Sequence, residues 1–425
     1  MNLFYQLTGY KKGDKQFIVP FLLVTILFFL WAFLHNVNPI LIPHLKKACE
    51  LSDTQSALID SSVYIAYFLI ALPAGIFIKK YGYKKGILFG LFLYATGALL
   101  FVPAASVRSF YFFLFALFVI ASGATFLETV ANPYMTLLGE PQNGARRLNF
   151  AQSFNGIGAF IAPILGGKFI LSGIEYSKTD LAKMPTEQLQ QYLQHESDAV
   201  KIPYLIIAFI VLIVLIIILF NKLPELKNNK TEKSVLSFKV FQYKHLRWAV
   251  IAQFFYVGAQ VGVGSFFIRF SKSVMNMHEK DAAFLWGSIA MVGFMVGRFA
   301  GTFFMKFISS NKLLFAYTVI NIVLLSIAIT WHHAMAVYVL MAVPFFMSIM
   351  FPTIFALGVE NLGEDAKLGS SFLIMSIVGG AFIPLTMGII SDVTHSIQIA
   401  YIAPLICFFV VAYFGWKGYK PITHE

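Results

Sequence analysis

The sequence is poor in charged residues: Asp, Glu, Lys and Arg make up 12% of its 425 residues, whereas hydrophobic residues make up 58%. A typical soluble domain is about one quarter charged, so this composition excludes a water-soluble enzyme or binding domain. The mean hydropathy of +0.75 agrees with that exclusion. We therefore expect an all-α membrane protein, because a helix satisfies its own backbone hydrogen bonds within lipid.

Cysteine is nearly absent as well. Cys49 and Cys407 lie far apart in the sequence and suggest neither a disulfide nor a metal site. The apolar segments contain no paired carboxylates, no HExxH motif and no nucleophile–base set, so we expect neither an enzyme nor a bound cofactor. The polar, basic N-terminal stretch MNLFYQLTGYKKGDKQ does not resemble a cleavable signal peptide.

Long apolar runs are abundant. A membrane-spanning helix needs about 20 apolar residues, and twelve segments meet this requirement. They are 17–43, 56–79, 86–105, 109–137, 147–172, 202–221, 246–271, 281–306, 312–331, 334–360, 368–391 and 396–416. An even number of spans places both termini on the same side of the membrane.

The basic residues are distributed unevenly between the two sides. Alternate connections and the termini carry 21 Lys and Arg residues, whereas the opposite connections carry 8. Because cytoplasmic loops are enriched in Lys and Arg, we expect both termini in the cytoplasm. The net charge of +12 thus indicates topology rather than a nucleic-acid partner.

The longest charged connection divides the spans into two groups of six. We expect an N-terminal bundle over 1–221, a cytoplasmic linker over 222–245 and a C-terminal bundle over 246–425. The halves look like distant copies, since GAFI at 158–161 recurs at 380–383 and an NPYMTLLG segment at 132–139 resembles FPTIFALG at 351–358. Such repeats are typical of transporters that rock two bundles around a midplane site.

One carboxylate lies deep in a predicted span. Glu128 follows the apolar run FYFFLFALFVIA, and a charge at that depth is costly, about 2.5–3.5 kcal/mol on insertion scales. Helical spacing places it on one face with other polar residues: Ser122, Thr125, Thr129 and Asn132. We expect this polar stripe to face a substrate or ion site. The alternative is a structural carboxylate bonded to a neighbouring helix.

Amide side chains recur on other spans. They are Asn36 and Asn38 beside His35 on the first span, then Asn149, Gln152 and Asn155, which share one helix face, and finally Gln253, Tyr256 and Gln260, which share another. Amides both donate and accept hydrogen bonds, and aromatic rings can stack on a sugar ring, so this mixture suits a neutral, polyhydroxylated ligand. An anionic ligand would favour arginines at the midplane, and the candidates Arg269 and Arg298 are expected near span ends. Interhelical hydrogen bonds are the alternative role for any single amide.

Several segments carry a resemblance to a known family. They are FFLWAFLHNVNPILIPHL (28–45), FLETVANPYMTLLG (126–139), RLNFAQSFNGIGA (147–159), KMPTEQLQQY (183–192), RWAVIAQFFYVGAQ (247–260), FPTIFALGVENLG (351–363) and KLGSSFLIMSIVGGAFIP (367–384). The chain resembles the L-fucose permease branch of the major facilitator superfamily, which also contains glucose/galactose permeases. The resemblance runs from Phe17 to about Tyr419.

The resemblance implies a major facilitator fold of twelve helices in two pseudo-symmetric halves, and a sugar–proton symporter that works by alternating access. It implies proton or sugar binding at Glu128 and sugar binding at Gln152, Asn155, Asn36 and Asn38. We expect a monomer in the inner membrane of a bacterium that imports a neutral hexose, L-fucose first and glucose or galactose second. A Na⁺-coupled or uncoupled facilitator on the same fold remains an alternative, and a non-transporting sensor would carry a soluble signalling domain.

The chain departs from the family at one position. Where fucose permeases carry a span-one Asp tied to proton translocation, this chain has Pro39, which can neither bind a proton nor donate a backbone hydrogen bond. Span two instead carries Asp60, at a similar expected depth. Asp60 could take over the missing role of a proton site, or it could be an exposed acid in a first helical turn, favoured there by the helix dipole.

The replacement of Asp60 by Asn tests the takeover hypothesis. If Asp60 carries the proton, Asp60→Asn abolishes pH-dependent sugar accumulation in cells or vesicles, because the amide does not titrate. Accumulation that keeps the wild-type pH dependence would refute the hypothesis.

Overall fold

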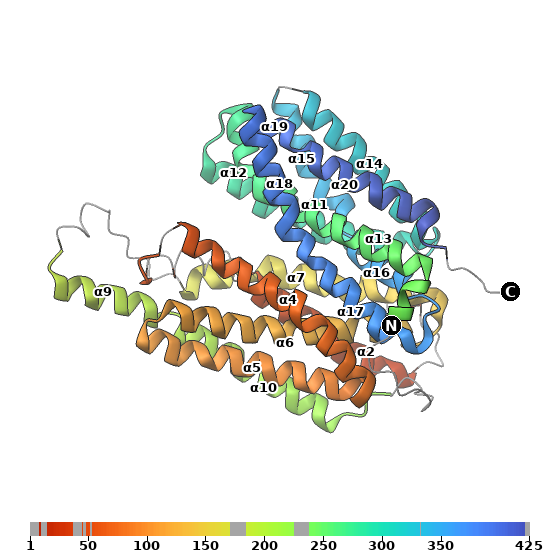
Figure 1. Ribbon diagram of the computed structural model, residues 1–425, viewed down its shortest axis with the longest axis horizontal. Helices are drawn as coiled ribbons and strands as arrows, with labels where there is room; N and C mark the ends of the chain where they lie inside the picture. The colour runs from red at the N-terminus through yellow and green to blue at the C-terminus, as the bar shows by residue number, and fades with distance from the viewer. Residues whose placement is uncertain are drawn as a thin grey trace.

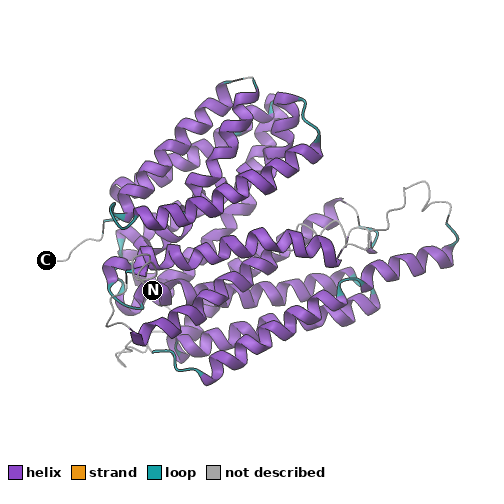
Figure 2. Ribbon diagram, turned by 180° about the vertical axis from the view of Figure 1, so that it is seen from behind, coloured by secondary structure: helices purple, strands orange, loops and turns teal. Residues whose placement is uncertain are grey.

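The computed structural model describes residues 8–9, 15–36, 45, 48–51, 53–170, 184–224, 238–331 and 333–420. Within these residues the chain forms helices and loops and no strand (Figure 2). Eleven segments of the described chain are helical, long and apolar enough to cross a membrane. The helix of 27 residues that follows the Glu128 span, Gly144–Ile170, brings the number of long helical segments to the predicted twelve.

The first predicted span runs to 43, but its helix ends at His35; the other membrane-length helices of the first half begin and end within about three residues of the predicted spans. The helices of this half are α2 (Lys15–His35), α4 (Asp53–Tyr81), α5 (Tyr83–Val107), α6 (Phe110–Leu137), η1 (Pro141–Asn143), α7 (Gly144–Ile170), α9 (Thr186–Asp198) and α10 (Lys201–Phe220). Local sequence sets their ends: Gly82 takes a positive φ between α4 and α5, and the Ser109 side chain accepts a hydrogen bond from the Phe112 N–H at the start of α6.

The spans of the second half are broken more often. They comprise η2 (Phe238–Gln242), α11 (Lys244–Met275), α12 (Glu279–Leu285), η3 (Trp286–Ala290), α13 (Met291–Phe304), α14 (Ser310–Thr330), α15 (Ala334–Met347), α16 (Met350–Gly358), η4 (Gly363–Asp365), α17 (Ala366–Met375), η5 (Ser376–Val378), α18 (Gly379–Thr394), α19 (Ile397–Ala400), α20 (Ile402–Tyr413) and η6 (Phe414–Gly418). The predicted span 334–360 is thus two helices, α15 and α16, separated by a turn.

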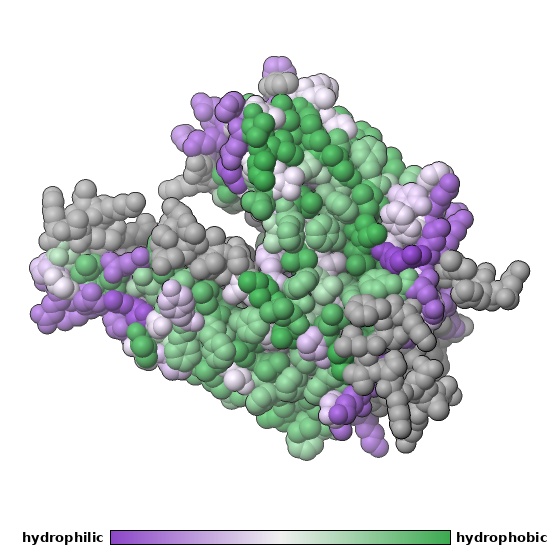
Figure 3. All heavy atoms as spheres, viewed as in Figure 1, coloured by the Kyte–Doolittle hydropathy of each residue, from purple (hydrophilic) through white to green (hydrophobic). Residues whose placement is uncertain are grey.

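The helices form two groups that meet at one end. In Figure 1, α2 to α10 lie together below and most of α11 to α20 lie above, with α17 extending down beside α4. The groups touch through α17 against α4 and α6, and through α13 and α16 against α7. They diverge toward the side of α9, and the space-filling view shows an opening between them there (Figure 3).

Apolar side chains cover the flanks of both groups, whereas hydrophilic residues gather at the ends (Figure 3). Large hydrophobic residues such as Tyr111, Phe209 and Phe220 are well exposed on these flanks. Water would not tolerate this much exposed apolar surface, but lipid does. The distribution is that of a bundle embedded in a bilayer.

Close helix contact at α5 and α6 yields a prediction. A Cβ atom added to Gly123 of α6 would lie 2.6 Å from the Tyr94 nitrogen and 2.7 Å from the Gly90 oxygen, both main-chain atoms of α5. Gly123→Ala should therefore push the two helices apart and destabilise the protein by about 1–3 kcal/mol. The measurement is the melting temperature of the purified protein, which should fall by several degrees.

Gly388→Ala is the matched control, because a Cβ there meets no atom within 4 Å. Equal melting temperatures for the two variants would contradict the packing argument.

Candidate functional site

Glu128 lies inside the molecule with one side-chain partner. It is 8% exposed, about 14 Å along α6 from the Leu137 end. Its Oε1 accepts a hydrogen bond of 2.6 Å from the Tyr67 hydroxyl of α4. No Lys or Arg among the described residues forms an ion pair with it. Within the part of the chain that the structure describes, the carboxyl group is therefore held by a neutral donor and not by a counter-ion.

Two amides extend this contact from α6 to α7. The Asn132 Nδ2 donates to the main-chain oxygen of Glu128 at 3.0 Å, and the Gln152 Nε2 donates to the Asn132 Oδ1 at 3.1 Å. Both amides are buried. The structure thus brings together Glu128, Asn132 and Gln152, which were predicted from two separate spans, in one connected polar group.

The rest of the predicted stripe on α6 is directed to its own helix. The hydroxyls of Ser122 and Thr125 donate to the carbonyls of Phe118 and Ala121. The Thr129 hydroxyl is buried without a hydrogen-bond partner among the described residues. Within the described chain, Glu128 and Asn132 are the members of this stripe whose side chains hydrogen-bond to other helices.

The other residues predicted to bind the ligand differ in whether their side chains already form hydrogen bonds within the protein. Asn36 follows the end of α2, and its Nδ2 donates to the Ala32 oxygen at 2.7 Å. Asn38 lies outside the described residues. Asn155 and Gln260 are partly buried and make no hydrogen bond to another described residue, so their amides are available to a ligand.

Tyr256 of α11 is fully buried, and its hydroxyl donates to the Met347 oxygen at 3.0 Å. That oxygen lies at the break between α15 and α16. In this state Tyr256 therefore binds the protein's own main chain. The neighbouring Gln253 is also fully buried, and both polar atoms of its amide lack a partner among the described residues.

Arg298 lies six residues before the end of α13, near a span end as expected, but it is buried there. Arg298 is 3% exposed and reaches into the boundary between the two halves. Its Nε donates to the Ser348 oxygen at 2.8 Å and its Nη1 to the Gln152 oxygen at 2.7 Å. Sequence reasoning missed this contact because only the crossing of α13 over α7 creates it.

Two further partners were missed for the same reason. Tyr67 was not singled out, although it is the partner of Glu128. Thr353 of α16 accepts a hydrogen bond of 3.1 Å from the Asn149 Nδ2 of α7, which links the two halves. The one available signal for Tyr67 was its position seven residues after Asp60, on the same face of α4.

Asp60 is not in a first helical turn as expected. The helix begins at Asp53, earlier than the predicted 56, so Asp60 lies about two turns inside α4. Its side chain lies outside the described residues. The position of the backbone removes the helix-dipole explanation, because that effect falls off within the first turn.

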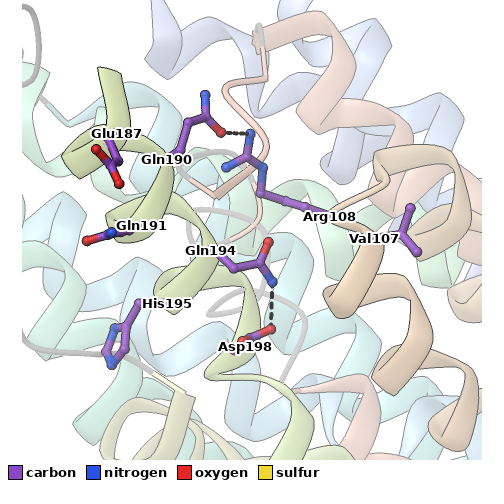
Figure 4. Close-up of a pocket in the computed structure, with 8 residues that line it drawn as sticks. All are labelled: Val107, Arg108, Glu187, Gln190, Gln191, Gln194, His195 and Asp198. Carbon is purple, nitrogen blue, oxygen red and sulfur yellow. Dashed lines mark hydrogen bonds between the residues drawn. The ribbon is translucent and has the colours of Figure 1, made fainter. Parts of the chain in front are cut away.

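A pocket at the wide end of the molecule lies apart from these residues. It is formed by α9 and the end of α5, and Figure 4 shows Arg108 directed toward α9. There the Arg108 Nη2 donates to the Gln190 Oε1 at 2.7 Å, and the Gln194 Nε2 donates to the Asp198 Oδ1 at 2.8 Å. Among the described residues no group of three or more His, Cys, Asp or Glu side chains is placed to hold a metal ion.

Comparison with known proteins decides the family. The profile of the Major Facilitator Superfamily matches residues 21–384. The chain belongs to the major facilitator superfamily. This confirms the predicted fold class and the multi-pass membrane character of the chain, and it places the protein among transporters and not enzymes.

Relatives within the superfamily match along nearly the whole chain. The L-fucose-proton symporter of Escherichia coli (strain K12) is 42% identical over 97% of this chain and 98% of its own length. A glucose/galactose transporter of Brucella abortus is 40% identical over 96% of both chains. These names confirm the predicted branch of the major facilitator superfamily.

Solved structures agree with the superfamily. The crystal structure of the transporter FucP in the outward conformation has a TM-score of 0.88 at 42% identity and covers 95% of this chain and 99% of that chain. A proton:xylose symporter has a TM-score of 0.73 at 12% identity, covers 97% of both chains and shows the fold alone.

The contact between Tyr67 and Glu128 yields a prediction. Tyr67→Phe leaves a buried carboxyl oxygen without its donor, and this should destabilise the protein by about 1–3 kcal/mol. Tyr67→Phe should lower the melting temperature of the wild-type protein but lower that of a Glu128→Ala variant much less, because alanine offers the tyrosine no acceptor. Tyr111→Phe, on the exposed face of α6, serves as control. Additive effects of Tyr67→Phe and Glu128→Ala would show that the hydrogen bond contributes nothing.

Proposed function

We propose that this protein is a secondary active transporter that imports a neutral hexose together with a proton, by alternating access between its two halves. The observation that carries the proposal is the buried Glu128, joined through Asn132 to Gln152 and lacking a counter-ion among the described residues. L-fucose is the first candidate substrate, as in the name of the Escherichia coli relative. Glucose or galactose is the second, on the names of the Brucella relatives.

The chemistry of the site suits an uncharged sugar. The proposed ligand groups are mostly amides, which can both donate to and accept from sugar hydroxyls. The substrate-binding residues we propose are Asn36, Asn38, Glu128, Asn132, Gln152, Asn155, Tyr256 and Gln260. Arg298 is linked to this group through its hydrogen bond to the Gln152 oxygen. Its Nε and Nη1 both donate to main-chain oxygens, and this argues against recognition of a carboxylate or phosphate by the arginine.

Proton coupling follows from the enclosure of Glu128. An ionised carboxylate is costly to seal inside a low-dielectric bundle without a cation beside it. A proton removes the charge, and the neutral carboxylic acid can also donate a hydrogen bond to a sugar hydroxyl. Closure of the halves over bound sugar is therefore easier when Glu128 is protonated, and this links the two binding events.

Asp60 is proposed as a second proton site. The support is its position on α4, seven residues before Tyr67: this spacing returns to the same helix face, and Tyr67 contacts Glu128. This supports the hypothesis that Asp60 replaces the span-one acid of the family, whose position is occupied by Pro39 in this chain. If it does not compensate, the family's span-one acid has no replacement, and a Na⁺-coupled or uncoupled facilitator becomes the alternative to test.

The orientation in the membrane is part of the proposal. The excess of Lys and Arg supports cytoplasmic termini in a bacterial inner membrane, so the opening on the α9 side faces outward, as in the outward structure of FucP. We also propose that 1–221 and 246–425 move as two six-helix units joined by the linker 222–245. The transporter is proposed to act as a monomer.

Transport in reconstituted vesicles tests the function. Wild-type protein should accumulate a hexose against its gradient when the outside is acidic, and a panel of L-fucose, galactose, glucose, mannose and N-acetylglucosamine identifies which one. A proton ionophore should abolish accumulation. Accumulation that survives the ionophore and requires Na⁺ would favour Na⁺ coupling.

Glu128→Gln separates coupling from transport. The amide keeps the shape but cannot release a proton, so uphill uptake should fall to background while exchange of sugar across the membrane persists. Glu187→Gln, an exposed acid of α9, should behave as wild type. Concentrative uptake by Glu128→Gln would show that another group couples the proton.

A further inference from the structure

Arg298 is a buried cation at the boundary between the halves. It is 3% exposed, its guanidinium carbon lies 4.5 Å from the centre of the Phe294 ring, and no acidic side chain among the described residues pairs with it. Ionisable residues inside a membrane bundle are costly and mark functional positions by default. The interactions that hold this charge are therefore informative.

One acceptor of Arg298 is a main-chain oxygen left free by a proline. In a continuous helix the Ser348 oxygen would accept from the N–H of residue 352, four positions on. That residue is Pro352, which has no N–H. The Arg298 Nε supplies the missing donor at 2.8 Å, and Tyr256 donates to the neighbouring Met347 oxygen. Arg298 thus stabilises the break between α15 and α16.

The other acceptor lies in the opposite half. The Arg298 Nη1 donates at 2.7 Å to the oxygen of Gln152, whose side chain leads through Asn132 to Glu128. The two helices approach closely here, since a Cβ on Gly156 of α7 would lie 3.6 Å from the Met295 side chain of α13. A planar guanidinium holds two acceptors in a fixed relative position.

We propose that Arg298 is a positioning residue for sugar binding: it fixes the backbone of Gln152 against the α15–α16 break and thereby sets the sugar affinity of the outward-open state. The proposal rests on the proposed transport of a hexose. Because α13 and α7 belong to different halves, the bond to Gln152 holds in states where these helices are in contact. Loss of this hydrogen bond should therefore weaken sugar binding more than it lowers the rate of transport.

If Arg298 had a purely structural role, its hydrogen bond to the Ser348 oxygen would be the only one of its contacts that matters. Pro352→Ala separates the two roles, because this variant regains a main-chain N–H that can donate to the Ser348 oxygen. If Arg298 only caps that oxygen, Pro352→Ala should make the arginine dispensable. If Arg298 acts through Gln152, Pro352→Ala cannot replace it.

The experiment compares purified and reconstituted full-length variants. Sugar Kd is measured by tryptophan quenching, and KM and kcat by exchange, for Arg298→Gln, Arg298→Lys, Pro352→Ala and the Arg298→Gln/Pro352→Ala double variant. The hexose is whichever one wild type binds in the panel. Arg269→Gln, an exposed arginine of α11 stacked on Phe266, is the matched control.

We expect Kd and KM to rise at least tenfold in Arg298→Gln, with a smaller change in kcat. Arg298→Lys should be similarly impaired, because one ammonium group cannot donate to both oxygens in the fixed geometry of the planar guanidinium. The double variant should stay as weak as Arg298→Gln, while Pro352→Ala and Arg269→Gln stay within about twofold of wild type. Size-exclusion profiles and melting temperatures verify that each variant folds. If Arg298→Gln does not fold, Arg298→Lys replaces it both as the single variant and in the double variant with Pro352→Ala.

Three results would overturn the proposal: wild-type affinity in Arg298→Gln, recovery by Pro352→Ala, or recovery by Arg298→Lys. The second would reduce Arg298 to a helix cap, and the third would show that charge alone suffices. Wild-type protein that binds none of the hexoses would instead overturn the proposed function, so the two failures are distinguishable.

Discussion

The structure depends on one constraint: polar groups enclosed in a bilayer must find their hydrogen-bond partners within the protein. Glu128 meets this constraint through a single tyrosine hydroxyl from α4, while its main-chain oxygen also accepts from Asn132. The same requirement ties Asn132 to Gln152 and Gln152 to Arg298. Hydrogen bonds between these buried polar groups therefore join α4, α6, α7 and α13.

The features that the sequence predicted well are those carried by local pattern. Except at the end of α2, which comes eight residues before the predicted end of the first span, hydropathy alone located the long helical segments to within a few residues, because lipid thickness sets the length of each apolar run. Helical spacing also identified Asn132 and Gln152 as members of inward faces. The depth of Glu128 followed from its place in an apolar run. Each of these properties is decided by residues close together in the chain.

The features that the sequence did not predict depend on how distant helices cross. The pairing of Tyr67 with Glu128 joins residues 61 positions apart, and Arg298 meets Gln152 over 146 positions. An arginine in an apolar segment is visible in the sequence, but its partners are not. The break after Met347 was also missed, because Pro344 and Pro352 lie in a run whose hydropathy stays high.

The acceptors of Arg298 are main-chain oxygens, and this has a consequence for genetics. An alanine scan would remove the side chains of Gln152 and Ser348 but leave both carbonyl oxygens in place. The link between the halves would survive each of those substitutions and register only when the arginine itself is changed. Covariation between these positions would be weak for the same reason, since any residue offers the same carbonyl. A connection of this kind is visible in coordinates and nearly silent in sequence statistics.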